Sequence, residues 1–136
     1  MKKQKVAIIT AASKGIGAAC ATQLASEGYK LVLMSRSDSL FALCDQLNAR
    51  PLKGSIEDEN DIARLIDFTY EKYGRIDAVV CNTGHASKGS LLALTDSDWK
   101  KGMNLLLMNV IRLAKFIGPI MAKQKGGAFV NISTFG

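Results

Sequence analysis

Histidine and cysteine are both scarce in this chain of 136 residues. His85 is the only histidine, and the three cysteines, Cys20, Cys44 and Cys81, form no Cys-x-x-Cys pair. Zinc sites are usually built from several such side chains at short spacings, so we predict no metal site. An odd, scattered set of thiols is typical of reduced cysteines, which predicts a cytoplasmic location and no disulfide framework.

A long uninterrupted apolar run is also missing. The most apolar stretch, Met103–Met121, is broken by four polar or charged residues, Asn104, Asn109, Arg112 and Lys115. This pattern does not indicate a membrane span. The basic segment Lys2–Lys5 precedes an apolar run that is too short for a signal peptide. Repeats and low-complexity tracts are absent as well, and the length suits a single domain.

The net charge of +6 would attract a polyanion. Nucleic-acid-binding surfaces, however, cluster their basic residues and interleave aromatic ones, whereas here lysine and arginine are dispersed. We therefore predict no nucleic-acid partner. We attribute the charge to solvated surface and to a local site for a phosphorylated ligand.

Short apolar strands alternate with amphipathic helices along the whole chain. The predicted strands are Val6–Thr10, Lys30–Ser35, Pro51–Gly54, Ile76–Cys81 and Ala128–Ser133. The predicted helices are Ala18–Glu27, a helix capped by Ser37 or Asp38, Asp58–Tyr73 and Ser97–Lys123. We expect Phe41 and Phe68 to face inward on the second and third of them. Such alternation predicts an α/β fold with a parallel sheet of five strands, and ligands at their carboxyl ends.

Small residues follow the first predicted strand, in the order Thr10-Ala11-Ala12-Ser13-Lys14-Gly15-Ile16-Gly17. Backbone amides at the start of the following helix would attract a phosphate, and small side chains would let it approach closely. The alternative is that these residues only pack the strand against the helix. The P-loop pattern and the Gly-x-Gly-x-x-Gly pattern are both absent.

This turn resembles the Thr-Gly-x-x-x-Gly-x-Gly turn of the short-chain dehydrogenase/reductase family, with Ala11 at the first glycine. Cys81-Asn82-Thr83-Gly84 is similar to that family's Asn-Asn-Ala-Gly, and the preceding Gly74–Val80 segment also resembles it. From Asp98-Trp99 to Ser133 the spacing matches without a gap, so the resemblance covers residues 5–135. It implies a Rossmann-type doubly wound sheet. It also implies an oxidoreductase that transfers hydride between a nicotinamide cofactor and a carbonyl or alcohol substrate.

Twelve residues are the predicted cofactor-binding set: Thr10, Ala11, Ser13, Lys14, Gly15, Ile16, Gly17, Arg36, Ser55, Ile56, Asn82 and Gly84. Arg36 follows the second strand, where an acidic residue would bind a ribose 2′-hydroxyl and an arginine accommodates a 2′-phosphate. With Lys14 nearby, this favours NADP over NAD. Ser55 stands where the family usually has aspartate. Alanine at position 11 would be strained if the backbone there requires a positive φ.

The family's catalytic groups are an asparagine, a serine, a tyrosine and a lysine. Their first two positions fall on Leu106 and Thr134, and no Tyr-x-x-x-Lys occurs in these residues. We predict that Thr134 and Asn109, one turn beyond Leu106, serve as catalytic residues. Residues 1–136 are then a dinucleotide-binding domain that lacks the catalytic part and is inactive alone. The alternative is a catalytically inactive nucleotide-binding or association module.

Apolar residues surround most of the predicted helix 97–123. A helix on a sheet needs only one apolar stripe, so its second face needs a partner. A neighbouring helix, another part of the chain or a second subunit could cover it. We predict a homo-oligomer that forms through this helix.

Overall fold

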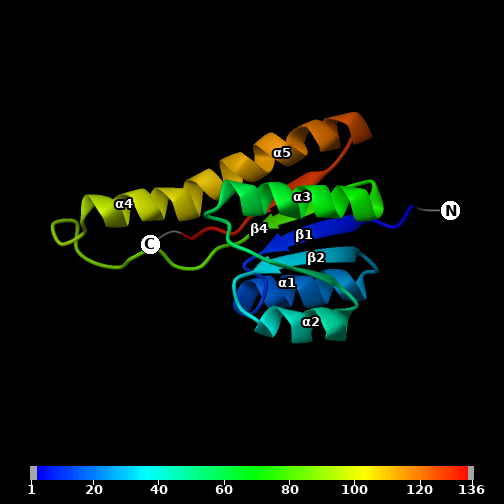
Figure 1. The fold of residues 1–136 in the computed structure, drawn as a ribbon, viewed down its shortest axis with the longest axis horizontal. Coiled ribbons are helices and arrows are strands. Elements are labelled where there is room, and N and C mark those ends of the chain that lie inside the picture. The colour runs from blue at the N-terminus through cyan, green and yellow to red at the C-terminus, as the bar shows by residue number, and fades with distance from the viewer. Residues whose placement is uncertain (1–2, 135–136) are drawn as a thin grey trace.

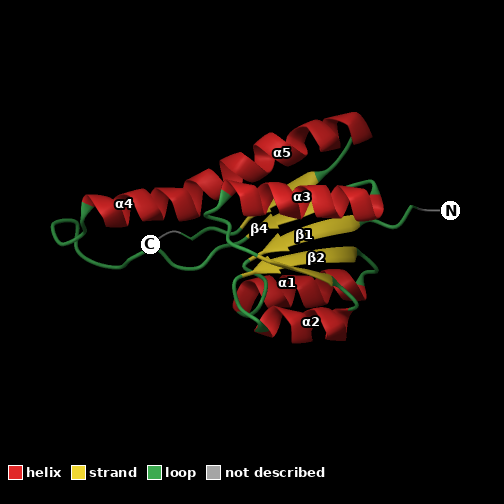
Figure 2. Ribbon diagram, in the orientation of Figure 1, coloured by secondary structure: helices red, strands yellow, loops and turns green. Residues whose placement is uncertain are grey.

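The computed structural model describes residues 3–134. Its centre is a parallel sheet of five strands in the order β3-β2-β1-β4-β5 (Figures 1 and 2). The strands are β1 (Val6–Thr10), β2 (Lys30–Ser35), β3 (Arg50–Lys53), β4 (Ala78–Cys81) and β5 (Ala128–Asn131). The order reverses at β1, whose two neighbours in the sheet are β2 and β4. The predicted fold class is confirmed.

Helices cover both faces of the sheet. The helices α1 (Gly15–Ser26) and α2 (Ser39–Leu47) lie on one face, and α3 (Glu59–Tyr73) and α5 (Asn109–Gln124) lie on the other (Figure 2). The strand sequences explain this, because successive side chains point to opposite faces and nearly all are apolar. Ile8 and Val32 pack toward α3 and α5, and Ile9 and Leu33 pack toward α1 and α2.

Two predicted inward residues lie outward instead. The side chain of Phe68 on α3 is 36% exposed, and Phe41 on α2 is also exposed. The buried stripe of α3 consists of Ile62, Leu65, Ile66 and Thr69. These positions follow i, i+3, i+4 and i+7, and Phe68 falls off that stripe.

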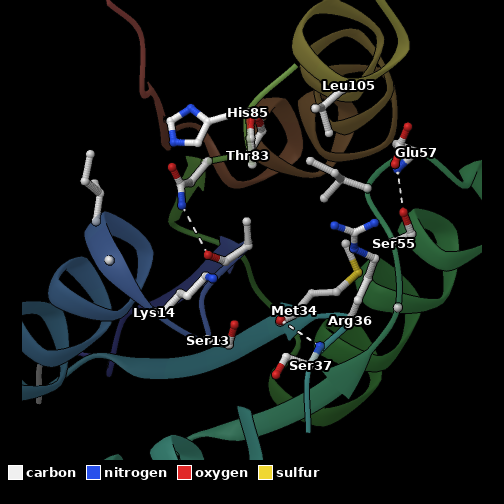
Figure 3. A pocket seen from close by; sticks show the side chains of 18 residues that line it. Ser13, Lys14, Met34, Arg36, Ser37, Ser55, Glu57, Thr83, His85 and Leu105 are labelled. Carbon is white, nitrogen blue, oxygen red and sulfur yellow. Dashed lines mark hydrogen bonds between the residues drawn. The ribbon is translucent and has the colours of Figure 1, made fainter. Parts of the chain in front are cut away.

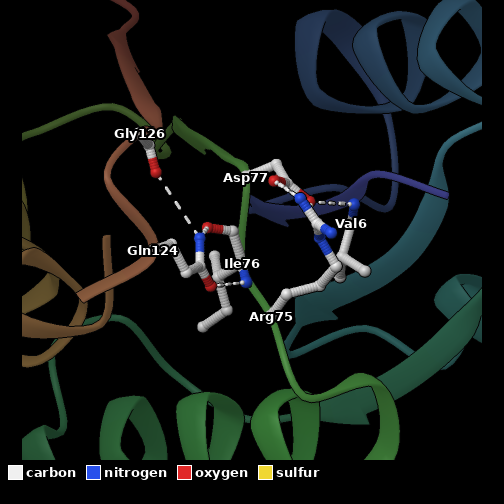
Figure 4. Close-up of polar contacts among 6 residues, drawn as sticks. All are labelled: Val6, Arg75, Ile76, Asp77, Gln124 and Gly126. Carbon is white, nitrogen blue, oxygen red and sulfur yellow. Dashed lines mark hydrogen bonds and ion pairs between the residues drawn. The ribbon is translucent and has the colours of Figure 1, made fainter. Parts of the chain in front are cut away.

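The amino ends of β1 and β4 are joined by a polar cluster (Figure 4). Arg75 donates two hydrogen bonds to the carboxylate of Asp77, at 2.8 and 2.6 Å, and the Val6 amide donates a third at 2.8 Å. The Arg75 guanidinium holds the pKa of Asp77 below its ordinary value. The side chain of Gln124 exchanges two hydrogen bonds with the backbone of Ile76. These bonds engage the backbone of Ile76 outside the sheet, and β4 begins at Ala78, two residues later than predicted.

One continuous helix runs from Asp96 to Gln124. It consists of α4 (Asp96–Met103), the π-helical segment η1 (Asn104–Met108) and α5. Thr95 caps it through a capping box with Asp98, and α4 projects beyond the end of the sheet (Figure 1). By length and composition alone this helix could cross a membrane. Of its most apolar 18-residue window, 22% is buried, and the buried residues of α5 pack against the sheet.

Candidate functional site

The turn between β1 and α1 is tightly wound. Ala11 has φ 48° and Gly15 has φ 58°, both in the left-handed region. Lys14 is the N-cap of α1 in an extended conformation, without a side-chain cap bond. The first amides of α1 are therefore not capped by a side chain at this helix end, which is the arrangement that favours an anion.

Gly17 lies against the backbone of this turn. A methyl group at Gly17 would come within 2.5 Å of the Ala11 carbonyl oxygen and 2.8 Å of Asn82 Nδ2. No side chain larger than hydrogen fits there without movement. The absence of a side chain at Gly17 keeps the start of α1 in contact with the turn.

Asn82 connects the turn to the end of β4. Its side-chain Nδ2 donates to the Ala11 carbonyl at 3.2 Å. Its backbone N–H donates to Thr10 Oγ1 at 3.0 Å, and that hydroxyl donates to the Asn82 carbonyl at 2.7 Å. These bonds fix the ends of β1 and β4 to each other at the point where the strand order reverses. Open α/β sheets bind ligands at this point.

A cleft of about 730 Å³ opens at this edge of the sheet (Figure 3). Its lining comes from the segments that follow β1, β2, β3 and β4, with Leu105 from the long helix. The lining residues are Ala11, Ser13, Lys14, Gly15, Ile16, Met34, Ser35, Arg36, Ser37, Gly54, Ser55, Ile56, Glu57, Asn82, Thr83, Gly84, His85 and Leu105. The volume falls within the range typical of ligand and cofactor sites.

Every predicted cofactor-binding residue lines this cleft except Thr10 and Gly17. These two lie against Asn82, which does line it. The prediction did not include eight lining residues: Met34, Ser35, Ser37, Gly54, Glu57, Thr83, His85 and Leu105. All but Leu105 lie at or shortly after the ends of predicted strands, so their place at the carboxyl ends was a usable signal. Leu105 comes from a distant helix and carries no signal in the sequence.

The two predicted catalytic residues lie outside the lining. Asn109 is buried, and its Nδ2 donates to the carbonyl of Leu105, one turn earlier on the helix. Its Oδ1 is buried and has no hydrogen-bond partner among the described residues. Thr134 is exposed and follows β5 at the carboxyl edge of the sheet.

Positive charge predominates in the cleft, where Lys14 and Arg36 face a single carboxylate, that of Glu57. The acidic group nearest to Arg36 in sequence, Asp38, is paired with Lys53 at 2.6 Å. Cys81, at the end of β4, is buried, and burial raises its pKa to about 11. Its thiol therefore remains protonated at neutral pH, which suits a packing role better than a nucleophilic one.

The sequence profile of the family described as short chain dehydrogenase matches residues 5–135. The chain belongs to this family. Among curated proteins, it is 32% identical over 136 residues to a 3-oxoacyl-[acyl-carrier-protein] reductase of Thermotoga maritima. It is 34% identical over 134 residues to dehydrogenase/reductase SDR family member 4 of Caenorhabditis elegans. The matches cover 96% and 93% of this chain but 55% and 52% of those relatives. The chain thus spans about half the length of these relatives.

Solved structures agree with this assignment. A metagenomic short-chain oxidoreductase in complex with NADP superimposes with a TM-score of 0.91 at 29% identity, over 97% of this chain and 63% of that one. The L-sorbose reductase of Gluconobacter frateurii, complexed with NADPH and L-sorbose, gives 0.85 at 29% identity, over 95% and 52%. The short-chain dehydrogenase fold is therefore present throughout the described residues.

Proposed function

We propose that the cleft binds NADP(H), and that this chain is the nucleotide-binding part of an oxidoreductase acting on a carbonyl or alcohol substrate. One observation carries the proposal. The uncapped start of α1 and the guanidinium of Arg36 line the same cleft at the point where the strand order reverses. The relatives crystallised with NADP and NADPH support it.

The residues of the cleft suit the successive parts of such a cofactor. The amides of Gly15 and Ile16, with the side chain of Ser13, would hold the pyrophosphate, because they lie at a helix N-terminus. Arg36 would pair with the 2′-phosphate. Asp38, which would repel that phosphate, forms an ion pair with Lys53 at 2.6 Å. These contacts favour NADP over NAD.

The nicotinamide end would lie toward Asn82, Gly84 and His85. The bound nicotinamide would supply or accept the hydride. The protein would position the ring beside the end of β4 and limit the access of water. We propose that Thr134 contacts the substrate oxygen. We also propose that Asn109 Oδ1 holds a water molecule that moves protons, since this oxygen is buried without a protein partner among residues 3–134.

Two observations favour the alternative function, that of an inactive nucleotide-binding relative. Leu106 stands at the position of the family's asparagine, and Thr134 stands at that of its serine. Oxidation of NADPH by the full-length protein with a panel of aldehydes and ketones would separate the two functions. The inactive relative would bind NADPH without oxidising it.

We further propose that the protein self-associates through the outer face of the helix Asp96–Gln124 and resides in the cytoplasm. Leu106, Leu107 and Ile111 expose about half of their side chains on this face. An apolar stripe of this kind is typical of an interface. The cytoplasmic location is supported by Cys20, Cys44 and Cys81, which are all free thiols.

Titration of the Arg36→Ala variant tests the cofactor assignment. Losing one charged contact to a phosphate costs about 1.5–3 kcal/mol, so the NADPH dissociation constant should rise by about tenfold or more. That of NADH should remain nearly unchanged. Arg50→Ala removes the same kind of side chain at the amino end of β3, outside the lining of the cleft. It should leave the dissociation constants of both cofactors unchanged. Equal losses for both cofactors in the Arg36 variant would contradict the role of Arg36.

A further inference from the structure

The end of the cleft beside β3 is formed by the loop Gly54–Glu57, which is held firmly. The Gly54 amide donates to the Ser35 carbonyl at 3.0 Å, so the loop follows the end of β2. The Ser55 amide donates to Asp61 Oδ2 on α3 at 2.8 Å. The carbonyl of Glu57 accepts from Asn104 Nδ2 at 3.1 Å. The loop is therefore fixed to the sheet and to two helices.

These bonds place the hydroxyl of Ser55 in a defined position. Ser55 Oγ accepts a hydrogen bond from the Glu57 amide at 3.2 Å (Figure 3). The proton of this hydroxyl has no acceptor among residues 3–134, and one lone pair of the oxygen remains free. A hydroxyl can rotate, so the same atom can donate to a ligand or accept from it.

The base of the cofactor should reach this loop. This step rests on the proposed function. With the pyrophosphate at the turn after β1 and the 2′-phosphate at Arg36 after β2, the next position along the sheet order is the end of β3. Ser55 and Ile56 line the cleft there. Ile56 belongs to the apolar core, and its small exposed part, 7%, adds apolar surface to this end of the cleft.

We infer that Ser55 makes this cleft nearly indifferent to whether the purine carries an amino group or a carbonyl oxygen at its six-position. A carboxylate at this place could only accept, so it would favour the amino group of adenine and repel the carbonyl of hypoxanthine. The Ser55 hydroxyl accepts from the first and donates to the second. The cleft therefore does not discriminate between the two bases, because the serine hydroxyl can either accept or donate a hydrogen bond.

The two probes are NADPH and its deamino analogue, in which hypoxanthine replaces adenine, each titrated into the protein by calorimetry. For the unaltered protein we expect dissociation constants within about threefold of each other, since one neutral hydrogen bond replaces another of similar strength. In Ser55→Asp the analogue should bind about tenfold or more weakly relative to NADPH.

Ser37→Asp is the matched control, because it adds the same charge on the ribose side of the cleft. It should weaken both ligands and leave their ratio unchanged. Glu57→Gln tests the other carboxylate of this loop and should also leave the ratio unchanged. Ser55→Ala should weaken the binding of both ligands equally. If circular dichroism shows that Ser55→Asp does not fold, Ser55→Ala still tests the inference.

A tenfold or greater preference of the unaltered protein for NADPH would overturn the inference. So would an unchanged ratio in folded Ser55→Asp, an unequal loss in Ser55→Ala, or a ratio that moves in Glu57→Gln. If neither nucleotide binds, the proposed function fails instead. Failure of the inference and failure of the function are therefore distinguishable.

Discussion

Ala11 has a backbone conformation that favours glycine. Its φ of 48° places it in the left-handed region, where an L-residue with a Cβ is strained. The turn keeps this geometry because Asn82 Nδ2 bonds the Ala11 carbonyl and Gly17 packs behind it. The sequence comparison located this residue as the one departure from glycine in the turn. The structure adds that the position does require a positive φ.

Ala11→Gly should therefore stabilise the domain. Relief of the left-handed strain is worth about 1–2 kcal/mol, and the greater freedom of glycine in the unfolded chain offsets about 0.4–1 kcal/mol. We expect the free energy of unfolding in urea to rise by roughly 0.5–1 kcal/mol. Ala12→Gly, at the next residue, should lower it, because Ala12 is buried and has no positive φ. A loss of stability in Ala11→Gly would show that the alanine is not strained.

At the scale of single elements, the long helix is the one in which the sequence was least informative. Its start and its end were predicted to within one residue. The π-helical segment Asn104–Met108 was not predicted. Leucine and methionine occupy four of its five positions, so the apolar pattern there has no period that could reveal a change in helical pitch.

Asn109 directly follows this segment, and its side chain bonds the Leu105 carbonyl inside it. In the full-length protein, Asn109→Leu should lower turnover by about tenfold or more, the lower range for a group that assists proton transfer. The NADPH dissociation constant should stay close to that of the unaltered protein, because Asn109 does not line the cleft. The pH dependence of turnover should also change, which a purely structural role would not cause.

Asn60→Leu provides the control for that experiment. It makes the same replacement at an exposed position in the first turn of α3. Turnover and its pH profile should remain as in the unaltered protein. If Asn109→Leu is folded by circular dichroism and retains full turnover, Asn109 has only a structural role.

At the scale of the whole molecule, the alternation of strands and helices was enough to predict the fold. It was not enough to predict how exposed the outermost elements, β5 and α4, are. All five strands lie where the apolar runs predicted them. The ends of β1 and β2 are as predicted, and those of β3, β4 and β5 differ by at most two residues. The segments that line the cleft could be predicted because parallel strands end at one edge. The exposure of β5 and the projection of α4 depend on what packs beside them, and a local sequence pattern carries no information about such neighbours.

The outer face of the long helix provides the whole-molecule test. Leu107 is 45% exposed on that face. If it is buried between two copies, Leu107→Glu removes about 1.5–3 kcal/mol of apolar burial per copy and adds a charge. Light scattering after size-exclusion chromatography should then show the full-length protein shifted to smaller species. Leu92→Glu, at a 96% exposed position in the loop before α4, should leave the assembly unchanged. An unaltered protein that is monomeric at every concentration would contradict the interface.

The hydrogen bonds that join Thr10, Ala11 and Asn82 have a consequence for the energetics of recognition. They hold the two sides of the cleft in register before any ligand arrives. A receptor that is already ordered loses little conformational entropy when it binds, so more of each contact with the ligand is realised as affinity. The strained backbone at Ala11 is part of the same arrangement. The cost of shaping the cleft is therefore part of the free energy of folding and not of the free energy of binding.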